Sequence, residues 1–405
     1  AQAILNEVIS GNPSQLRGYT EVAGQSARVI VANPYGITCN GCGFINSPRV
    51  TLTTGKPVFD NGRLDRFQVD QGSVAIEGAG LNATNVDRFE IITRSAKINA
   101  QLQAQNLTTV AGRNDVNAQT LNATARADDG SAKPQLAIDS SALGGMYAGA
   151  IKLVGTEAGV GVKLDGKLIA SGGDIQLDAN GQLSLVDTSA TGAVNVKAAS
   201  LDARGPVYAG TALTVQTQGN LTNRQTLAAR DSISLSAGGQ LTNAGAIDAG
   251  VNADGRRNAS GDLSLTTQNL DNTGKSLTAS RNLTINAAQT VSNQGGTLSG
   301  QTAVISAGTL DNSDGGKAQS SAHLKLNAGQ VNNAHGVILA DTLDINALSL
   351  NNRDGVVTSD SDLRLTLEQS LNNHSGEVSS AGVSRVDANR VDNTSGLMTG
   401  TDKLT

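Results

Sequence analysis

Large side chains are scarce in this sequence of 405 residues. It has no tryptophan, and its four tyrosines and four phenylalanines bring aromatic residues to only 2 %. Such a chain cannot fill a compact core with large side chains, so it has to bury many small aliphatic ones in a repetitive way. The six prolines end at Pro206, and the last aromatic residue is Tyr208. From residue 209 onward the chain therefore has a different and more uniform composition.

Clusters of charge and long apolar runs are also missing from the sequence. The formal net charge is −5, and lysine and arginine are scattered along the chain, so we expect no surface for nucleic acid or an anionic membrane. No apolar run approaches the roughly 18 residues that span a bilayer, so we expect no membrane span. The sequence begins AQAILNEV, without a methionine or a charged n-region. We therefore expect a processed or truncated piece whose targeting signal lay upstream.

One asparagine recurs through the second half of the chain. It ends phrases such as LTN (221–223), LDN (310–312) and VDN (391–393), and successive members lie 19 to 21 residues apart, with one interval of 29. The long interval contains the polar stretch VNADGRRNAS (251–260), which we interpret as a loop inserted into one repeat. The series consists of Asn223, Asn243, Asn272, Asn293, Asn312, Asn333, Asn352, Asn373 and Asn393.

Within each repeat, apolar residues alternate with polar ones. Segments such as LSL (263–265), LKL (324–326) and LRL (363–365) have an apolar period of two, which predicts half-buried strands. A single repeat cannot bury its inner face alone, so neighbouring repeats must stack. We predict an all-β fold, a parallel β-helix (solenoid) with coils of about 20 residues and strands about 4.8 Å apart. A less regular alternation at 72–112 and 164–188 extends this architecture toward the N-terminus.

Candidate catalytic and metal-binding residues are few. The three histidines, His323, His335 and His374, fall in separate repeats without an acidic residue at matching offsets, so we interpret them as surface imidazoles. A β-helical polysaccharide lyase would need a carboxylate cluster and aromatic platforms for sugars, and the repeats contain no aromatic ring. We therefore expect no enzymatic activity, no cofactor and no metal, with the lyase as the least favoured alternative.

Several segments resemble a known protein family. ILNEV (4–8) and ANPYGITCNGCGFIN (32–46) closely resemble the secretion domain of two-partner-secretion exoproteins, as do GLNATNVDRFEIITRSAKINA (80–100) and LGGMYAGAIKLVGTEAGVGVK (143–163). The repeats from residue 221 resemble filamentous-haemagglutinin repeats. The family includes filamentous haemagglutinins and the CdiA-like proteins of contact-dependent growth inhibition. We therefore divide the chain into the C-terminal part of a secretion domain (1–130), transitional β-helix coils (131–220) and haemagglutinin repeats (221–405).

The resemblance implies a right-handed β-helical filament at the surface of a Gram-negative bacterium. It would be exported through the periplasm by an outer-membrane transporter that binds the N-terminal domain. We expect a monomeric stalk that carries a distal receptor-binding and toxin region toward neighbouring bacteria. The alternative is a haemagglutinin-type adhesin that binds host cells through the filament itself. The sequence lacks the family's usual NPNL motif before ILNEV and its large C-terminal region, so we expect this piece alone to be neither secreted nor toxic.

The stretch Asn33-Pro34-Tyr35-Gly36 has the composition of a four-residue turn, with proline in the second place and glycine in the fourth. Two interpretations of this turn stay open. It either serves only to shape the first coils or, as the resemblance implies, it is presented to the periplasmic domains of the transporter.

Cys39 and Cys42 flank Asn40-Gly41, the preferred pair for a tight turn with positive φ. Such a turn holds its first and fourth Cα atoms within about 7 Å, close to the 4.4–6.8 Å that a disulfide requires. The family's route through the oxidising periplasm also favours the bond. A thioredoxin-like pair would need a helix N-terminus, and a zinc site would need two more ligands. We therefore predict a disulfide and no free thiol.

The recurring asparagine has two possible roles. The alternation in LTN, LDN and VNN puts it on the same inward face as the Leu or Val two residues earlier. A buried amide is costly unless it is paired, and amides stacked about 4.8 Å apart can hydrogen-bond to one another. We therefore predict an asparagine ladder, with each asparagine as a simple turn former as the alternative. The adjacent Ser313 is expected to be a turn residue whose substitution costs almost nothing.

Overall fold

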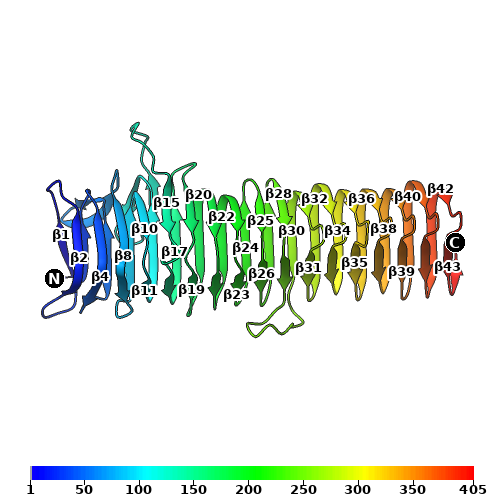
Figure 1. The fold of residues 1–405 in the computed structure, drawn as a ribbon, viewed down its shortest axis with the longest axis horizontal. Helices are drawn as coiled ribbons and strands as arrows, with labels where there is room; N and C mark the ends of the chain where they lie inside the picture. Colours follow the sequence, from blue (N-terminus) through cyan, green and yellow to red (C-terminus); the bar gives the residue numbers. More distant parts are fainter. Residues whose placement is uncertain (1) are drawn as a thin grey trace. The chain divides into compact units, whose positions relative to one another are not determined.

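The chain forms a parallel β-solenoid. The computed structural model describes residues 2–405, and these residues form strands and no helix. Coils are about 21 residues long, which confirms the predicted fold class and repeat length. The chain divides into two compact units, residues 1–209 (unit 1) and residues 210–405 (unit 2). Within each unit, the strands of consecutive coils lie side by side (Figure 1).

Unit 1 contains strands β1 to β23. Three parallel stacks run through it, β1-β3-β5-β9-β12-β17-β20-β22, β2-β4-β8-β10-β15-β18-β20 and β8-β11-β16-β19-β21-β23. The bounds are β1 Ala3–Glu7, β2 Ser14–Glu21, β3 Arg28–Ala32, β4 Ile37–Ile45, β5 Arg49–Thr53, β6 Lys56–Asp60, β7 Arg63–Gln68, β8 Ser73–Ala83, β9 Arg88–Thr93, β10 Ser95–Ile98, β11 Leu102–Ala104, β12 Asn106–Ala111, β13 Asn114–Asn117, β14 Ala123–Ala125, β15 Leu136–Ser140, β16 Met146–Ala148, β17 Ala150–Gly155, β18 Gly161–Leu164, β19 Leu168–Ala170, β20 Ile175–Leu185, β21 Thr188–Ala190, β22 Val194–Ala203 and β23 Val207–Ala209.

A second sheet of unit 1 is antiparallel, in the order β14-β13-β7-β6. Its β6–β7 hairpin turns at Asn61 and Gly62, whose φ angles of 49° and 74° are typical of a type I′ turn. Phe67 and Val116 on this sheet belong to one buried cluster with Ile92 of the solenoid coils. This hairpin was not predicted from the sequence, although an Asn-Gly pair between alternating segments is its strongest signal.

Unit 2 contains strands β24 to β44, in which one or two longer strands and one short strand make up each coil. The bounds are β24 Leu213–Thr217, β25 Leu221–Asn223, β26 Thr226–Ala229, β27 Ile233–Ala237, β28 Gln240–Asn243, β29 Ala246–Ala249, β30 Leu263–Asp271, β31 Ser276–Ala279, β32 Asn282–Ser292, β33 Thr297–Gly300, β34 Thr302–Asp311, β35 Lys317–Ser320, β36 His323–Asn332, β37 Val337–Ala340, β38 Thr342–Asn351, β39 Val356–Ser359, β40 Leu363–Asn372, β41 Glu377–Ser380, β42 Val383–Asp392, β43 Leu397–Gly400 and β44 Lys403–Leu404.

The core of unit 2 consists of aliphatic columns. Leu265 of β30 pairs in register with Ile285 of β32, which in turn pairs with Ile305 of β34, and all three side chains are buried. Because every coil turns the same strand face inward, each apolar residue stacks on its counterpart one coil away. No aromatic residue occurs in unit 2, so these columns fill the core without large rings.

The polar stretch 251–260 forms a loop between β29 and β30, as its composition predicts. Figure 1 shows it as a long green excursion away from the stacked strands. Val251 and Arg257 form an isolated antiparallel bridge at its base, and the guanidinium of Arg257 contacts the carboxylate of Asp248. The strands on either side remain paired, with Ala246 of β29 opposite Ser276 of β31. The insertion is therefore accommodated without a break in the stack.

Candidate functional site

The turn at residues 33–36 joins β3 to β4. The amide of Gly36 donates to the Asn33 carbonyl at 3.1 Å, and the amide of Tyr35 donates to Asn33 Oδ1 at 2.9 Å. Asn33 is fully buried, and its Nδ2 donates to the carbonyl of Asn12 and to Oγ of Ser14 at 2.8 and 2.9 Å. These contacts tie the turn to the preceding coil, while the side chain of Tyr35 stays 47 % exposed. The turn thus presents one aromatic ring from a firmly held base.

A cavity of about 350 Å³ lies beside this turn. Its lining includes Pro34 and Tyr35 of the turn, Ile9 after β1 and Pro57 of β6 in the antiparallel sheet. Ile9 is 87 % exposed, which is unusual for an aliphatic side chain. The turn, the segment after β1 and the hairpin therefore share one partly apolar surface.

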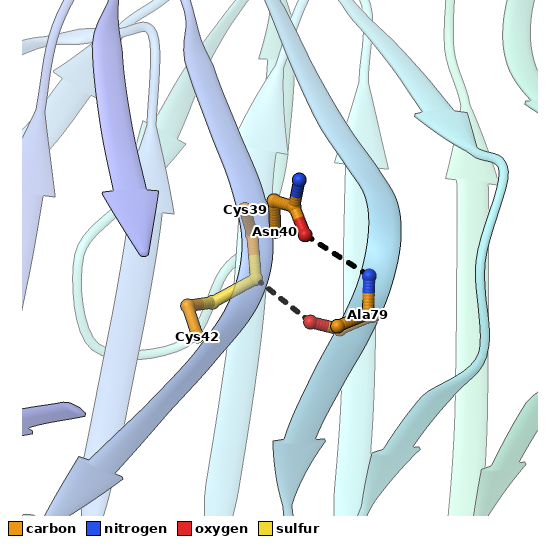
Figure 2. Close-up of a disulfide and its surroundings, with 5 residues drawn as sticks. Cys39, Asn40, Cys42 and Ala79 are labelled. Carbon is orange, nitrogen blue, oxygen red and sulfur yellow. Dashed lines mark hydrogen bonds between the residues drawn. A yellow bond between two sulfur atoms is a disulfide. The ribbon is translucent and has the colours of Figure 1, made fainter. Parts of the chain in front are cut away.

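Cys39 and Cys42 form a disulfide within β4, with Cα atoms 5.4 Å apart (Figure 2). Both residues are buried, and no cysteine of the described chain is free. Between them only Gly41 has a positive φ, 68°. The pairing of β4 with β8 shifts register between Asn40 and Cys42. The segment is therefore a bulge and not the expected tight turn, because the strand continues along the coil on both sides of it.

The bulge fits against a glycine-rich segment of β8. The amide of Ala79 donates to Asn40 Oδ1 at 3.0 Å, and Cys39 Sγ lies 3.5 Å from the carbonyl oxygen of Gly80 (Figure 2). A Cβ atom at Gly78, where φ is 61°, would collide with the Asn40 amide. Glycine is therefore required there by both the backbone angle and the close approach of the two coils.

A buried carboxylate of unit 1 was not predicted from the sequence. Glu90 on β9 is 1 % exposed and accepts hydrogen bonds from Arg49 Nε at 2.6 Å, Thr51 Oγ1 at 2.7 Å and the Arg28 guanidinium at 3.1 Å. A nitrogen of Arg88 lies 3.5 Å from Glu90. Burial of the guanidinium lowers the pKa of Arg28 to about 10, although Glu90 opposes this shift. The cluster forms only because the coil register brings β3, β5 and β9 together.

Charged groups also connect the antiparallel sheet to the coils. Arg28 and Arg49 both donate to the carbonyl oxygen of Ala118, at 2.8 and 2.9 Å. Asp70 accepts from Arg113 at 2.7 Å and from Arg126 at 2.9 Å. Burial alone would raise the pKa of Asp70, but the hydrogen bonds from the two arginines outweigh it and hold this pKa below its ordinary value. Hydrogen bonds from Arg28 and Arg49 therefore tie the antiparallel sheet to the coils, and the ion pairs of Asp70 hold together the segments that flank its strands.

The nine recurring asparagines lie on one inward column of unit 2. Nδ2 of each of the first eight donates to Oδ1 of the next, at 2.6 to 2.9 Å. The same amides reach backbone carbonyls of the next coil, as Asn312 does to Val337 at 3.0 Å. All but Asn393 are buried, and Oδ1 of Asn223 has no partner in the described part of the chain. The column is thus a series of bonds that all point in one direction.

In six repeats, the glycine three or four residues after the asparagine is explained by this column. A Cβ atom at Gly336 would lie 2.6 Å from Asn333 Oδ1 and closer still to the Asn312 carbonyl oxygen. The residue before it, His335, takes the left-handed conformation, with φ of 56°. Glycine is therefore needed at 336 for space, while a residue other than glycine tolerates the positive φ.

The expectation that the histidines lack acidic neighbours was wrong. His323 Nε2 lies 3.6 Å from Asp344 Oδ2, and His335 Nε2 lies 4.0 Å from Asp354 Oδ2. The register between coils, and not spacing within a repeat, brings these pairs together. Both rings are exposed at the surface, 40 % and 60 %. Among residues 2–405, no three His, Cys, Asp or Glu side chains are arranged to hold a metal ion. In the same range, no helix has the length and apolar character needed to cross a membrane.

Comparison with known proteins matches the two parts of the chain to two family models. The TPS secretion domain matches residues 1–185, and the haemagglutinin repeat matches residues 189–248, 245–314, 279–366 and 321–405. The 16S rRNA endonuclease CdiA of Enterobacter cloacae is 46 % identical over 313 residues, covering 76 % of this chain and 9 % of that protein. The tRNA nuclease CdiA of Escherichia coli strain STEC_O31 is 42 % identical over 315 residues, covering 77 % of this chain and 9 % of that protein. A filamentous haemagglutinin secretion domain of known structure is 31 % identical, with a TM-score of 0.39, covering 65 % of this chain and 73 % of that one.

The secretion-domain match and the haemagglutinin repeats, both on β-solenoid coils, indicate a secreted exoprotein. The chain belongs to the two-partner-secretion exoproteins with haemagglutinin repeats, which are secreted or cell-surface proteins of Gram-negative bacteria. It spans about a tenth of the length of the curated CdiA relatives that it matches. The boundaries drawn from the sequence at residues 130 and 220 stay a prediction.

Proposed function

We propose that this chain is the stalk of a CdiA-like effector of contact-dependent growth inhibition. The observation that carries the proposal is the 46 % identity to a CdiA protein over 313 residues, a length that exceeds the matched secretion domain and so extends into the repeats. The stalk projects a distal receptor-binding and toxin region toward neighbouring bacteria. The nuclease activities in the relatives' names describe proteins of which this chain covers about a tenth, so we assign no enzymatic activity to the stalk itself.

We assign the turn Asn33-Pro34-Tyr35-Gly36 to the contact with the outer-membrane transporter. The buried Asn33 anchors the turn and the half-exposed Tyr35 offers an aromatic ring, which is a common anchor in protein interfaces. We expect Tyr35→Ala to reduce the amount of exoprotein in the medium when it is co-expressed with its transporter. Tyr19→Ala is the control, because Tyr19 is a more exposed ring on β2, 75 % exposed. Equal export of both variants and the parent would remove the turn from the interface.

Growth inhibition is tested in co-culture with the complete exoprotein that contains this chain. Producing cells should reduce the count of target cells that lack the cognate immunity protein, and separation by a membrane filter should abolish the effect. If producing cells adhere to host cells but never inhibit bacteria, the haemagglutinin-type adhesin replaces this proposal.

A further inference from the structure

The sequence contains one pair of adjacent basic residues, Arg256-Arg257. Every other lysine and arginine is separated from the next one by at least one residue. The pair lies in the loop inserted between β29 and β30, where the chain of unit 2 leaves the stacked coils (Figure 1). The stack does not need this loop, because the strands on both sides of it stay paired with those of neighbouring coils.

The loop is exposed and held by few bonds. Every residue from 251 to 260 is exposed or half-buried. The side chain of Arg256 is 86 % exposed, and its guanidinium lies 3.8 Å from the carboxylate of Asp254. The carbonyl of Arg256 accepts a hydrogen bond from the amide of Asn252 at 2.8 Å. Local opening of the loop breaks this bond and the bridge at its base but uncovers no buried side chain, so it costs little free energy.

The second arginine of the pair is held against the coils. The guanidinium of Arg257 contacts the carboxylate of Asp248, and its Nη1 donates to Oγ of Ser280 at 3.0 Å and to the carbonyl of Ala249 at 3.3 Å. These contacts fix one side of the Arg256–Arg257 peptide bond. The side chain on the other side of the bond points into solvent, where a second protein can reach it.

We propose that the Arg256–Arg257 bond is a processing site for an endoprotease that recognises two adjacent basic residues. Carboxylates bind guanidinium groups, so such a protease has acidic pockets on both sides of the bond that it cleaves. Water adds to the carbonyl carbon of Arg256, the C–N bond to Arg257 breaks, and a carboxylate and an ammonium group remain. Exposed polar loops are the preferred places for such cleavage. This inference goes beyond the stalk function and does not depend on growth inhibition.

A second exposed loop, residues 126–134 of unit 1, shows why the pair matters. Its basic residues are not adjacent, and both are bound to the protein. Arg126 donates to Asp70 at 2.9 Å, and Nζ of Lys133 donates to the carbonyl of Ala158 at 3.1 Å. A protease that recognises paired basic residues therefore distinguishes the two loops, whereas a protease that needs only an exposed backbone cuts both.

Cleavage at this site leaves the stalk assembled. Before the loop, β29 pairs with β26 and β31, and after it, β30 pairs with β27, β28 and β32. Nδ2 of Asn243 donates to Oδ1 of Asn272 at 2.8 Å across the same junction. Cleavage therefore converts one continuous chain into two chains that strand pairing and core packing hold together. The distal part is then released by force or denaturation and not by the cut alone.

The test treats the 405-residue chain with two proteases under native conditions. Trypsin requires one basic residue before the bond, whereas an outer-membrane protease of the omptin class cleaves between two basic residues. We expect the omptin to make one early cut, with fragments 1–256 and 257–405 identified by mass spectrometry, and trypsin to cut at the same pair. In gel filtration, the cleaved protein should elute as the parent does and should separate into two fragments only in denaturant.

The variant Arg257→Gln separates recognition of the pair from exposure of the loop. It should slow cleavage by the omptin about tenfold or more, because one charge-assisted contact is lost, and it should not slow trypsin cleavage after Arg256. Asp248→Asn releases the guanidinium of Arg257 and should speed cleavage by the omptin. Lys275→Gln is the matched control, because Lys275 is an exposed basic residue of unit 2 without a basic neighbour, and it should change neither rate.

Circular dichroism should show that each variant keeps the β-structure of the parent. The proposal is overturned if the omptin cuts nowhere or first cuts elsewhere, including the loop at 126–134. It is also overturned if Arg257→Gln leaves the omptin rate unchanged, or if the two cleaved halves separate without denaturant.

Discussion

Units 1 and 2 build the same kind of coil and stabilise it by different means. In unit 1, the rings of Phe44 and Phe89 lie 6.0 Å apart, a disulfide bridges β4, and a buried Glu90 joins arginines from several coils. Unit 2 has no aromatic residue and no cysteine. Its buried asparagines instead repeat one side-chain hydrogen bond from coil to coil.

The two units differ in whether a stabilising contact occurs once or recurs in every coil. The Phe44–Phe89 contact and the ion pairs of Glu90 each occur once in unit 1 and join different coils, so a coil displaced by one register would lose them. Each contact of unit 2 recurs in the next coil, so stability is a sum of similar interface terms, and an insertion such as residues 251–260 is tolerated. Contacts that occur only once suit a unit that a partner must recognise. Contacts that recur in every coil suit a stalk that only needs length.

The largest expected effect is in unit 1. Glu90→Gln leaves the buried Arg28 and the nearly buried Arg49 without their carboxylate, and should cost about 3–5 kcal/mol of unfolding free energy. Denaturant unfolding measures the loss. Glu77→Gln is the control, because Glu77 is exposed on β8, and it should stay within about 0.5 kcal/mol of the parent. A cost below about 1 kcal/mol for Glu90→Gln would mean that the cluster contributes little to the stability of unit 1.

In unit 2, we expect the largest loss of stability from a substitution that fills the space beside the asparagine column. Gly336→Ala places a methyl group against Asn333 Oδ1 and the Asn312 carbonyl, which should cost about 3 kcal/mol. Gly274→Ala is the control, because a Cβ atom there meets open space and pays only for its φ of 67°, about 1 kcal/mol. If the two substitutions cost the same, the close approach is relieved by a small shift of the coils.

The regular unit was largely predictable from the sequence, and the irregular one was not. In unit 2, each repeat shows the apolar period of two, and the asparagine recurs from one repeat to the next. Stacking follows because one repeat cannot bury its inner face alone. In unit 1, Arg28, Arg49 and Glu90 are separated by tens of residues without a common phrase. Only the register of three strands brings them together, and a sequence pattern carries no information on register between irregular coils.

The candidate site shows the same division. The Asn33-Pro34-Tyr35-Gly36 turn follows from local turn chemistry, which spans a few residues. The Cys39–Cys42 pair could be predicted from its short spacing, although the segment between the cysteines is a bulge and not the predicted turn. The surface around the turn depends on the hairpin at Asn61-Gly62. The sequence contains the local signal for this hairpin, but it does not show that the hairpin packs against the coils. A short stretch of sequence therefore predicts a turn, whereas tertiary packing determines which residues lie next to that turn.

A smaller effect is expected from the asparagine column itself. Asn312→Ala removes the donor to Asn333 Oδ1 and the acceptor for Asn293 Nδ2, and should cost about 2 kcal/mol. The exposed Asn346→Ala is the control and should cost less than about 0.5 kcal/mol. Ser313 does not serve as a control, because it is buried and its Oγ donates to Asp311 at 2.6 Å. If Asn312→Ala and Asn346→Ala cost the same, the column consists of turn formers.

The smallest expected effect is on the pH dependence of the unfolding free energy. The ion pairs of unit 1 make their contribution depend on pH, whereas the asparagine amides of unit 2 do not. The pKa of Asp70 is lowered in the folded chain, so its contribution is present above the unfolded pKa of about 3.9 and is lost as the pH falls through the folded pKa. Asp70→Asn should cost only about 0.5–1 kcal/mol at pH 7, because the carboxylate is 39 % exposed and screened by solvent. Unfolding measured from pH 7 down to pH 2 should show this cost shrinking, whereas the cost of Asn312→Ala should not change. The exposed Asp60→Asn on β6 is the matched control. A cost of Asp70→Asn that persists at pH 2 would show that Asp70 acts through packing and not through its charge.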